Sequence, residues 1–143
     1  MKIMIINGPN LNLLGERNPD VYGRFTLEKL QSRIAERAAE YNWETEFYNS
    51  NHEGDIIDCL HNARNHYDAV ILNAGAYSHT SYAIRDAIEA ISTPVIEVHL
   101  SNIYAREPFR HTSVISAVCR GSIVGFGAAG YVLALESLLE MDE

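Results

Sequence analysis

The chain has 143 residues, of which 47% are hydrophobic and 21% charged, and this composition is typical of a globular protein rather than a disordered or collagen-like one. The formal net charge of −8 disfavours nucleic acid or an anionic membrane surface as a partner, and no apolar run approaches the roughly 18 residues that a membrane helix needs. The two cysteines are far apart and outside any C-x-x-C pattern, as in proteins of a reducing cytosol, so we expect a cytoplasmic protein whose residues 1–143 form one domain.

Short apolar runs alternate with amphipathic segments along the chain. Residues 3–6 predict a buried strand, and a long loop rich in Gly, Pro and Asn follows it. Thr26 is a suitable N-cap for the first helix. The buried face of that helix is predicted to carry Leu27, Leu30, Ile34 and Ala38. Trp43, Thr45 and Phe47 then alternate with polar residues, as in a half-buried strand.

The same alternation continues through the second half of the sequence. The remaining predicted elements are a helix near residues 56–60, a strand at 70–72, a helix with Ile84, Ala87, Ile88 and Ile91 inward, strands at 95–100 and 122–124, and a helix at 129–140. Strands that alternate with helices predict a parallel sheet covered on both faces. Five strands favour a flavodoxin-like α/β fold, a three-layer sandwich with strand order 2-1-3-4-5. Because such sheets bind ligands beyond the carboxyl ends of their strands, residues after the first, third and fourth strands should converge.

The long loop after the first strand carries a candidate reactive pair. Arg17 and Tyr22 lie in this loop with Pro19 between them. A tyrosine hydroxyl ordinarily ionises near pH ~10, so it needs a neighbouring cation to act as a base at neutral pH, and a guanidinium about 4 Å away supplies that order of energy. The alternative is a pair of solvated surface side chains, which the spacing alone leaves open.

Polar residues also stand at the ends of the third and fourth predicted strands. Asn73 opens a small polar turn, which is either a pocket wall that binds hydroxyl groups or an ordinary capped loop. Glu97 and His99 lie on one face of the fourth strand, where a carboxylate would orient the imidazole and raise its basicity, as in acid–base sites. A satisfied ion pair is the alternative, and a metal site that adds His79 fits the ligand types but no tight spacing motif.

Two further patterns bear on the chemistry. Residues 125–130 read Gly-Phe-Gly-Ala-Ala-Gly, a match to the dinucleotide-binding fingerprint, but they come too late in the chain, so close packing of the last helix is the better explanation. The lysines are Lys2 and Lys29, which fall on the first strand and on the polar side of a helix. Imine chemistry, which needs a desolvated lysine, is therefore disfavoured.

Six polar motifs occur in order along the chain. They are Asn7-Gly8-Pro9-Asn10-Leu11-Asn12, Arg17-x-Pro19-x-x-Tyr22-Gly23, Ser50-Asn51-His52-Glu53-Gly54, Gly75-Ala76-Tyr77-x-His79-Thr80-Ser81, Glu97-Val98-His99-Leu100-Ser101-Asn102 and Arg106-Glu107-x-Phe109-Arg110-His111. Together they resemble the type II 3-dehydroquinate dehydratase family over essentially the whole chain. Ala74 and Ser78 stand where Pro and Thr are common in that family, and neither departure removes a reacting group.

The resemblance implies a lyase that dehydrates 3-dehydroquinate to 3-dehydroshikimate by anti elimination through an enolate, with no metal, cofactor or Schiff base. The reaction belongs to the shikimate pathway of aromatic amino acid and chorismate biosynthesis, and the same reaction in quinate catabolism is the alternative. The resemblance also implies a homododecamer built from trimers and a mobile loop that closes over the substrate.

The resemblance further assigns roles to single residues. Tyr22 would remove the proton beside the ketone, with its phenolate favoured by Arg17. His99, oriented by Glu97, would protonate the departing hydroxyl. A water that stabilises the enolate oxygen would be positioned by Asn10. The substrate would be held by Asn73, His79, Arg110 and the backbone of Leu100 and Ser101, while Asp86 would reach the site of a neighbouring subunit.

Two functions from other classes compete with this interpretation, a flavodoxin-like binding or signalling module and a metal-dependent enzyme. A phosphoacceptor signalling module would need acidic residues after the first and third strands and a lysine after the fifth, where this chain has Asn7, Asn73 and Gly125. A flavin-binding module would be yellow when purified. A metal-dependent hydrolase or lyase would use Glu97 and His99 and would lose its activity on chelation.

Overall fold

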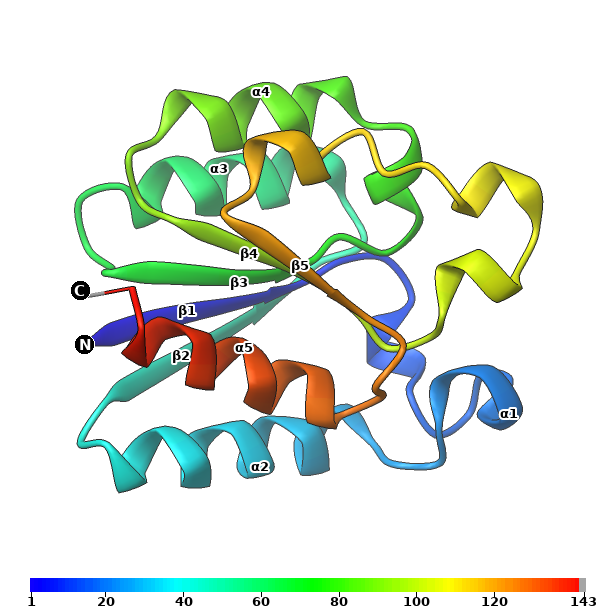
Figure 1. The fold of residues 1–143 in the computed structure, drawn as a ribbon, viewed down its shortest axis with the longest axis horizontal. Coiled ribbons are helices and arrows are strands. Elements are labelled where there is room, and N and C mark those ends of the chain that lie inside the picture. The colour runs from blue at the N-terminus through cyan, green and yellow to red at the C-terminus, as the bar shows by residue number, and fades with distance from the viewer. Residues whose placement is uncertain (142–143) are drawn as a thin grey trace.

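Residues 1–141, which the computed structural model describes, are arranged around a parallel sheet with strand order β2-β1-β3-β4-β5 (Figure 1). The strands are β1 (Lys2–Asn7), β2 (Glu44–Asn49), β3 (Ala69–Asn73), β4 (Val95–His99) and β5 (Gly121–Val124). This order confirms the predicted flavodoxin-like α/β sandwich. It also brings the carboxyl ends of β1, β3 and β4 to one edge of the sheet.

Helices cover both faces of the sheet (Figure 1). One face carries α2 (Leu27–Glu40) and α5 (Ala129–Leu139), and the other carries α3 (Glu53–Ala63) and α4 (Tyr82–Ala90). A one-turn helix, α1 (Pro19–Tyr22), lies in the loop after β1. The 3₁₀ turns are η1 (Leu11–Leu13), η2 (Gly75–His79), η3 (Ile103–Ala105), η4 (Pro108–Arg110) and η5 (Ser116–Val118).

Both faces of β1 are buried because a helical layer covers each of them. Ile3 and Ile5 pack in the cluster that includes residues of α2 and α5. Met4 and Ile6 pack in the cluster that includes residues of α3 and α4. The edge strand β2 instead alternates between half-buried and exposed residues, as its sequence predicts.

The first long helix begins and packs as its sequence predicts. The Thr26 hydroxyl accepts a hydrogen bond from the backbone N–H of Lys29 at 3.2 Å, which makes Thr26 the N-cap of α2. The buried residues of α2 are Leu27, Leu30, Ile34 and Ala38. The last helix ends at Leu139, one residue before the predicted end.

The loop between β1 and α2 contains more structure than its sequence predicts. Its first part forms η1, which is anchored by Leu11 and Leu14 in the core cluster beneath α2. Its second part forms α1, a four-residue helix without a buried residue. Turns this short leave no periodic pattern in a sequence, because a hydrophobic period needs several turns to repeat.

Gly130 explains the fingerprint-like string at residues 125–130. It lies buried in α5, and a Cβ atom there would come within 3.4 Å of Val98 Cγ1 and 3.5 Å of Ile123 Cγ2. These are ordinary van der Waals distances, so the helix packs directly on the sheet at Gly130, and close packing stays the prediction for the small residues of this string.

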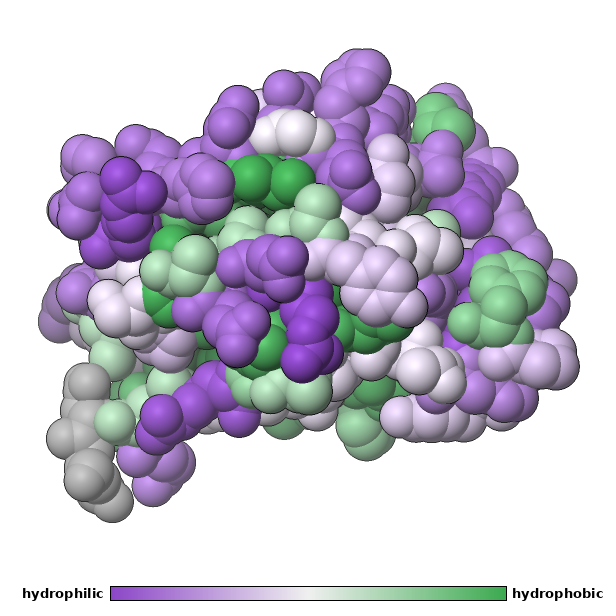
Figure 2. All heavy atoms as spheres, turned by 90° about the horizontal axis from the view of Figure 1, so that it is seen from above, coloured by the Kyte–Doolittle hydropathy of each residue, from purple (hydrophilic) through white to green (hydrophobic). Residues whose placement is uncertain are grey.

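Most of the surface on the α3 and α4 side is hydrophilic (Figure 2). In this view hydrophilic residues surround a smaller group of apolar residues in the middle. On the molecule as a whole, the exposed large hydrophobic residues include Tyr82, Phe109 and Phe126. Within residues 1–141, no helix has the length and apolar character that crossing a membrane requires.

Candidate active site

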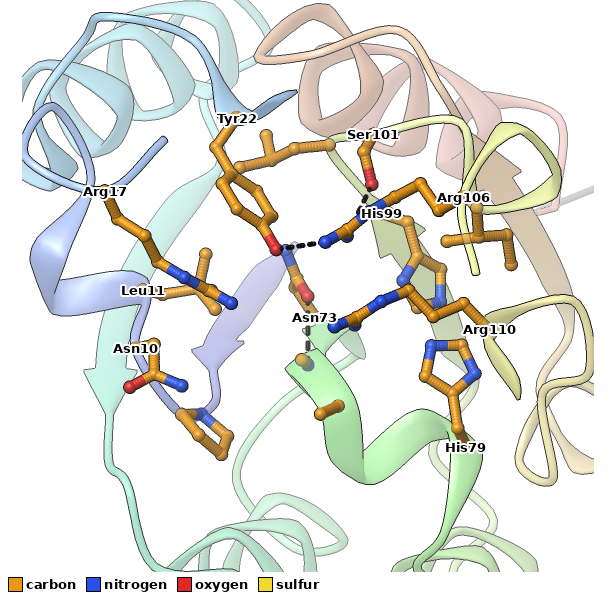
Figure 3. A pocket seen from close by; sticks show the side chains of 15 residues that line it. Asn10, Leu11, Arg17, Tyr22, Asn73, His79, His99, Ser101, Arg106 and Arg110 are labelled. Carbon is orange, nitrogen blue, oxygen red and sulfur yellow. Dashed lines mark hydrogen bonds between the residues drawn. The ribbon is translucent and has the colours of Figure 1, made fainter. Parts of the chain in front are cut away.

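A pocket lies beyond the carboxyl ends of β1, β3 and β4, the edge at which sheets of this topology bind ligands (Figure 3). It is lined by Pro9, Asn10, Leu11, Arg17, Tyr22, Asn73, Gly75, Ala76, His79, His99, Leu100, Ser101, Ile103, Arg106 and Arg110. About 40 Å³ is free among these side chains. This space suits a few water molecules, whereas sites for organic ligands typically enclose roughly 300–1,000 Å³. The side chains of the pocket therefore have to move apart before such a ligand enters.

The ends of β1 and β3 approach each other closely beneath the pocket. The backbone N–H of Gly8 donates to the carbonyl oxygen of Asn73 at 2.7 Å, and a Cβ atom at Gly8 would lie 2.7 Å from a backbone oxygen of the turn after β3. Gly75 in that turn has φ of +60°, a conformation that favours glycine. Asn10 has φ of +70°, and its N–H donates to Asn51 Oδ1 at 2.9 Å. The first of these bonds joins the ends of β1 and β3, and the Asn10 bond ties the loop to the residues that follow β2.

The side-chain amide of Asn73 is oriented by partners on both of its ends. Its Oδ1 accepts from the backbone N–H of Gly75 at 3.1 Å, and its Nδ2 donates to the Tyr131 hydroxyl at 3.0 Å. That hydroxyl donates in turn to Asn7 Oδ1 at 2.6 Å. Burial raises the pKa of Tyr131, so its hydroxyl keeps its proton and remains a donor. The amide of Asn73 is thus presented to the pocket in one orientation.

The Tyr22 hydroxyl points into the pocket between arginine side chains (Figure 3). Arg106 Nη2 donates to this hydroxyl at 2.7 Å, and Arg106 Nη1 donates to Ser101 Oγ at 3.2 Å. Arg17 Cζ lies 4.3 Å from the centroid of the Tyr22 ring. The guanidinium of Arg17 therefore lies over the Tyr22 ring rather than beside its oxygen. The sequence predicts Arg17 as the cation near the phenol, but the guanidinium that contacts the phenolic oxygen is that of Arg106.

Glu97 is completely buried, and donors surround both of its oxygens. Its Oε2 lies 2.5 Å from His99 Nε2 and accepts from Ser113 Oγ at 2.8 Å. Its Oε1 accepts from Ser116 Oγ and, at 3.4 Å, from Ser122 Oγ. Burial alone would raise the pKa of Glu97, but the hydrogen bonds from His99, Ser116 and Ser113 outweigh it and hold the pKa below its ordinary value. The carboxylate is therefore ionised at neutral pH.

His79 lies beside His99 at the same edge of the sheet (Figure 3). The two rings are stacked, with centroids 5.9 Å apart. His79 Nδ1 lies 2.9 Å from the carbonyl oxygen of Thr112. Burial lowers the pKa of His79 despite that contact, and the neighbouring His99 and Arg110 groups lower it further. The ring is therefore a neutral group of the pocket at neutral pH.

The remaining predicted binding residues lie at different places. Arg110 lines the pocket, and its Nε donates to Glu107 Oε2 at 2.8 Å. Leu100 and Ser101 follow β4 directly at the pocket edge. Asp86 lies exposed on α4, and the residues that line the pocket do not include it.

Among the described residues, the geometry supports neither the metal-based alternative nor a reactive role for the two cysteines. In the part of the chain that the structure describes, no three His, Cys, Asp or Glu side chains are placed to hold a metal ion. Burial raises the pKa of Cys59 to about 11, and burial with the nearby charge of Glu97 raises that of Cys119 to about 12. Both thiols are thus protonated and unreactive at neutral pH.

The structure brings most of the predicted site residues together. Those that line the pocket are Asn10, Arg17, Tyr22, Asn73, His79, His99, Leu100, Ser101 and Arg110, and Glu97 contacts it through His99. The sequence assigned no role to Arg106, although its charge in the segment after β4 was a usable signal. Nothing in the sequence singles out Ser113 or Ser116 among the other serines.

Known proteins resemble this chain over nearly its whole length. The family model described as dehydroquinase class II matches residues 1–139. The 3-dehydroquinate dehydratase of Exiguobacterium sp. is 59% identical over 140 residues, which cover 98% of this chain and 95% of the relative. That of Bacillus subtilis is 54% identical over 136 residues, which cover 95% and 92%. The crystal structure of type II dehydroquinase from Butyrivibrio crossotus superimposes with a TM-score of 0.95 at 50% identity, covering 96% of this chain and 97% of that one.

Proposed function

The chain belongs to the dehydroquinase class II family, and from this premise we propose how its pocket residues divide the reaction between them. The protein is a lyase that dehydrates 3-dehydroquinate to 3-dehydroshikimate, a step of the shikimate pathway. The proposed route is an anti elimination through an enolate. The observation that carries it is the placement of a phenol and an imidazole on different walls of one pocket. The Tyr22 phenol lies beside the cationic Arg106, which favours a phenolate, and the His99 imidazole lies beside the anionic Glu97, which favours an imidazolium.

Tyr22 is the proposed base. Its phenolate takes the proton from the carbon beside the ketone, and the electron pair of that bond moves into the enolate. The guanidinium of Arg106 at 2.7 Å and that of Arg17 over the ring both favour a negative charge on the phenolic oxygen. Asn10, at the pocket edge, positions the water that stabilises the enolate oxygen.

His99 is the proposed acid. The enolate collapses, the bond to the departing hydroxyl breaks, and the imidazolium supplies the proton that turns this hydroxyl into water. Glu97 stabilises the imidazolium through its contact with Nε2, so the other ring nitrogen, Nδ1, is the one that delivers the proton. The neutral imidazole left behind takes up a proton from solvent, and Tyr22 releases to solvent the proton it took from the substrate, so both groups return to their starting forms.

The remaining pocket residues are the proposed substrate contacts. Arg110 binds the carboxylate, because a guanidinium can form two parallel hydrogen bonds with it. Asn73, His79 and the backbone N–H groups of Leu100 and Ser101 bind hydroxyl and carboxylate oxygens. Asp86 is proposed to act in the pocket of a neighbouring copy, since it is exposed on α4 and apart from the pocket of its own chain.

The position of the lysines supports a route without a Schiff base. The residues that line the pocket include neither Lys2 nor Lys29. Lys2 Nζ pairs with Glu46 Oε1 at 3.2 Å, beside the edge strand β2. Borohydride added with the substrate is therefore expected to leave the activity intact, because there is no imine to reduce.

The proposed assembly is a homododecamer of trimers in the cytoplasm. The exposed aromatic residues Tyr82, Phe109 and Phe126 provide apolar surface of the kind that copies of a chain bury against each other. Sedimentation equilibrium is expected to give twelve times the chain mass of 16.0 kDa. A monomer at micromolar concentration would refute the proposed assembly.

The direct test is to add 3-dehydroquinate and follow the ultraviolet absorbance of the conjugated enone product. Absorbance is expected to rise at a rate proportional to enzyme concentration, and to do so at full rate after exhaustive chelation of divalent metals. Purified protein that produces no enone would overturn the proposed function, and activity that is lost on chelation and restored by a metal would overturn the proposed route.

A further inference from the structure

We propose that residues 112–116, between η4 and the first residue of η5, fix the tautomers of His79 and His99 in opposite senses, so that each ring presents a different nitrogen to the pocket. This inference rests on the function proposed above. Residues of the segment contact His79 directly and His99 through Glu97. The proposed reaction steps assign no role to residues 112–116.

The tautomer of His79 follows from its backbone partner. A carbonyl oxygen can only accept a hydrogen bond. The contact of 2.9 Å between the Thr112 carbonyl oxygen and His79 Nδ1 therefore places the ring proton on Nδ1. The other nitrogen, Nε2, is left without a proton and can accept a hydrogen bond from a substrate hydroxyl.

The tautomer of His99 follows from the serines that bind Glu97. Ser113 Oγ accepts the backbone N–H groups of Ile115 at 3.3 Å and Ser116 at 3.2 Å, so its single proton is directed to Glu97 Oε2 at 2.8 Å. Ser116 Oγ donates to Oε1. With these donors on both oxygens Glu97 acts as an acceptor only, which places a proton on His99 Nε2 and leaves Nδ1 for the pocket.

Residues 112–116 are themselves held firmly. The backbone N–H of Val114 donates to the carbonyl oxygen of Ser78 at 2.7 Å, and Arg85 Nη1 donates to the carbonyl oxygen of Val114 at 2.9 Å. The side chain of Ile115 is completely buried. The segment is therefore tied to η2 and α4 and can impose its hydrogen-bond pattern on both rings.

The opposite tautomers match two different tasks in the elimination. His79 offers an acceptor and stays neutral, while His99 keeps one proton on Nε2 throughout and binds and releases the transferred proton at Nδ1, so the neutral ring left after the transfer is the Nε2–H tautomer. Ser113 and Ser116 are thus positioning residues that act through Glu97. Their hydrogen bonds disperse the negative charge of Glu97. The carboxylate then stabilises the imidazolium of His99 less strongly, so His99 gives up its proton more readily.

Other ionisable groups line the pocket with His99 or lie near its partner Glu97. They are Glu97 on β4, His79 on η2, Arg17 and Tyr22 on the β1–α2 loop, Arg106 and Arg110 after β4, and Cys119, which lies near Glu97. Substitution of Ser113 or Ser116 leaves all of these groups in place. A change in the titration of activity in these variants therefore reports on the serine contacts.

The test is the pH profile of kcat for Ser113→Ala and Ser116→Ala. With a donor removed, Glu97 holds the imidazolium more strongly, and His99 releases its proton less readily. We expect kcat to fall about tenfold with KM within about twofold, and the basic limb of the profile to move upward by about one pH unit. Ser113→Thr and Ser116→Thr keep the hydroxyl and are expected to restore the position of the limb.

Ser137→Ala is the matched control, because Ser137 donates only within α5, to Ala134 O at 2.7 Å. The kcat of Ser137→Ala and the basic limb of its pH profile are expected to match those of the unmodified enzyme. Ser116→Ala carries the test if Ser113→Ala, which also loses two backbone contacts, does not fold. A basic limb that stays in place in the folded alanine variants would overturn this inference while leaving the proposed function intact. Absence of enone formation by the unmodified enzyme would overturn both.

Discussion

Glu97 and His99 lie on what we call the β4 wall of the pocket, together with Ser113 and Ser116. Both charged partners are almost fully buried there, and every contact is made with a strand or with a segment tied to a helix. Arg17 and Tyr22 form the α1 wall. The helix of this wall has four residues and buries none of them, and the Tyr22 hydroxyl is held by a single arginine from across the pocket.

The firmly held β4 wall carries the proposed acid, and the less firmly held α1 wall carries the proposed base. The β4 wall is preorganised, so the acid is oriented before any substrate arrives. The α1 wall is held less firmly, because α1 has no fully buried residue and only the partly buried Tyr22 ring packs against the core cluster. Since the closed pocket has about 40 Å³ of free space, we expect this wall to be the one that opens for the substrate.

The largest effect is expected from Tyr22→Phe. Removing the hydroxyl removes the proposed base and should lower kcat by about 10³-fold, within the range typical of general acid–base residues. KM is expected to stay within about tenfold, because Arg110 and Asn73 still bind the substrate. Initial rates of enone formation measure both constants, and a variant near full activity would show that the base lies elsewhere.

Glu97→Gln tests the preorganised wall. The amide cannot accept from all the donors that now surround the carboxylate, and it no longer stabilises the imidazolium. We expect kcat to fall about 10²-fold and the free energy of unfolding to fall by about 1–3 kcal/mol, because buried donors are left unsatisfied. Urea denaturation measures the second quantity. Equal stability and activity would contradict the description of the β4 wall.

Arg106→Ala tests the mobile wall. It removes the hydrogen bond to the Tyr22 hydroxyl while leaving the core intact, so kcat should fall about tenfold without a matching loss of stability. Limited proteolysis should cut residues 15–24 faster in this variant than in Glu97→Gln, because exposed and weakly held loops are cut first. The same cutting rate in both variants would mean that Arg106 does not hold the α1 wall.

The smallest effect is expected in the pH dependence of stability. Burial lowers the pKa of His79 below the ordinary value of ~6.5, so as the pH falls the unfolded chain takes up this proton before the folded one. Stability is therefore lost as the pH drops below ~6.5 towards the folded pKa. The melting temperature of His79→Gln should fall less between pH 7.5 and 5.5 than that of the unmodified protein. His61→Gln, at an exposed position, should not differ from it.

The fold was predictable because its signals are repeated. Leu27, Leu30, Ile34 and Ala38 mark the buried face of one helix at helical spacing, and the central strands are continuous apolar runs. The strand order then follows from the crossovers. The pocket was predictable for the same reason, since its residues follow directly on strands whose ends the topology brings together.

The contacts within the site were less predictable. The distance between Arg17 and Tyr22 along the chain does not say which atoms meet, and the position at the phenolic oxygen is taken by Arg106, far away in the sequence. Ser113 and Ser116 contact Glu97 across the turn that leads to β5, and no spacing rule marks such a contact. Side-chain geometry of this kind depends on packing, which a single sequence does not encode in a local pattern.

The Tyr131 hydroxyl has a consequence for how the enzyme becomes active during synthesis. It orients the pocket amide of Asn73 from a helix 58 residues further along the chain. A ribosome-bound chain therefore has nearly every side chain of the reaction before α5 has left the exit tunnel, yet Asn73 is then held by the Gly75 N–H alone and gains its second contact when that helix docks. Catalytic competence should appear late and abruptly in translation, as a property of docking rather than of the residues already made.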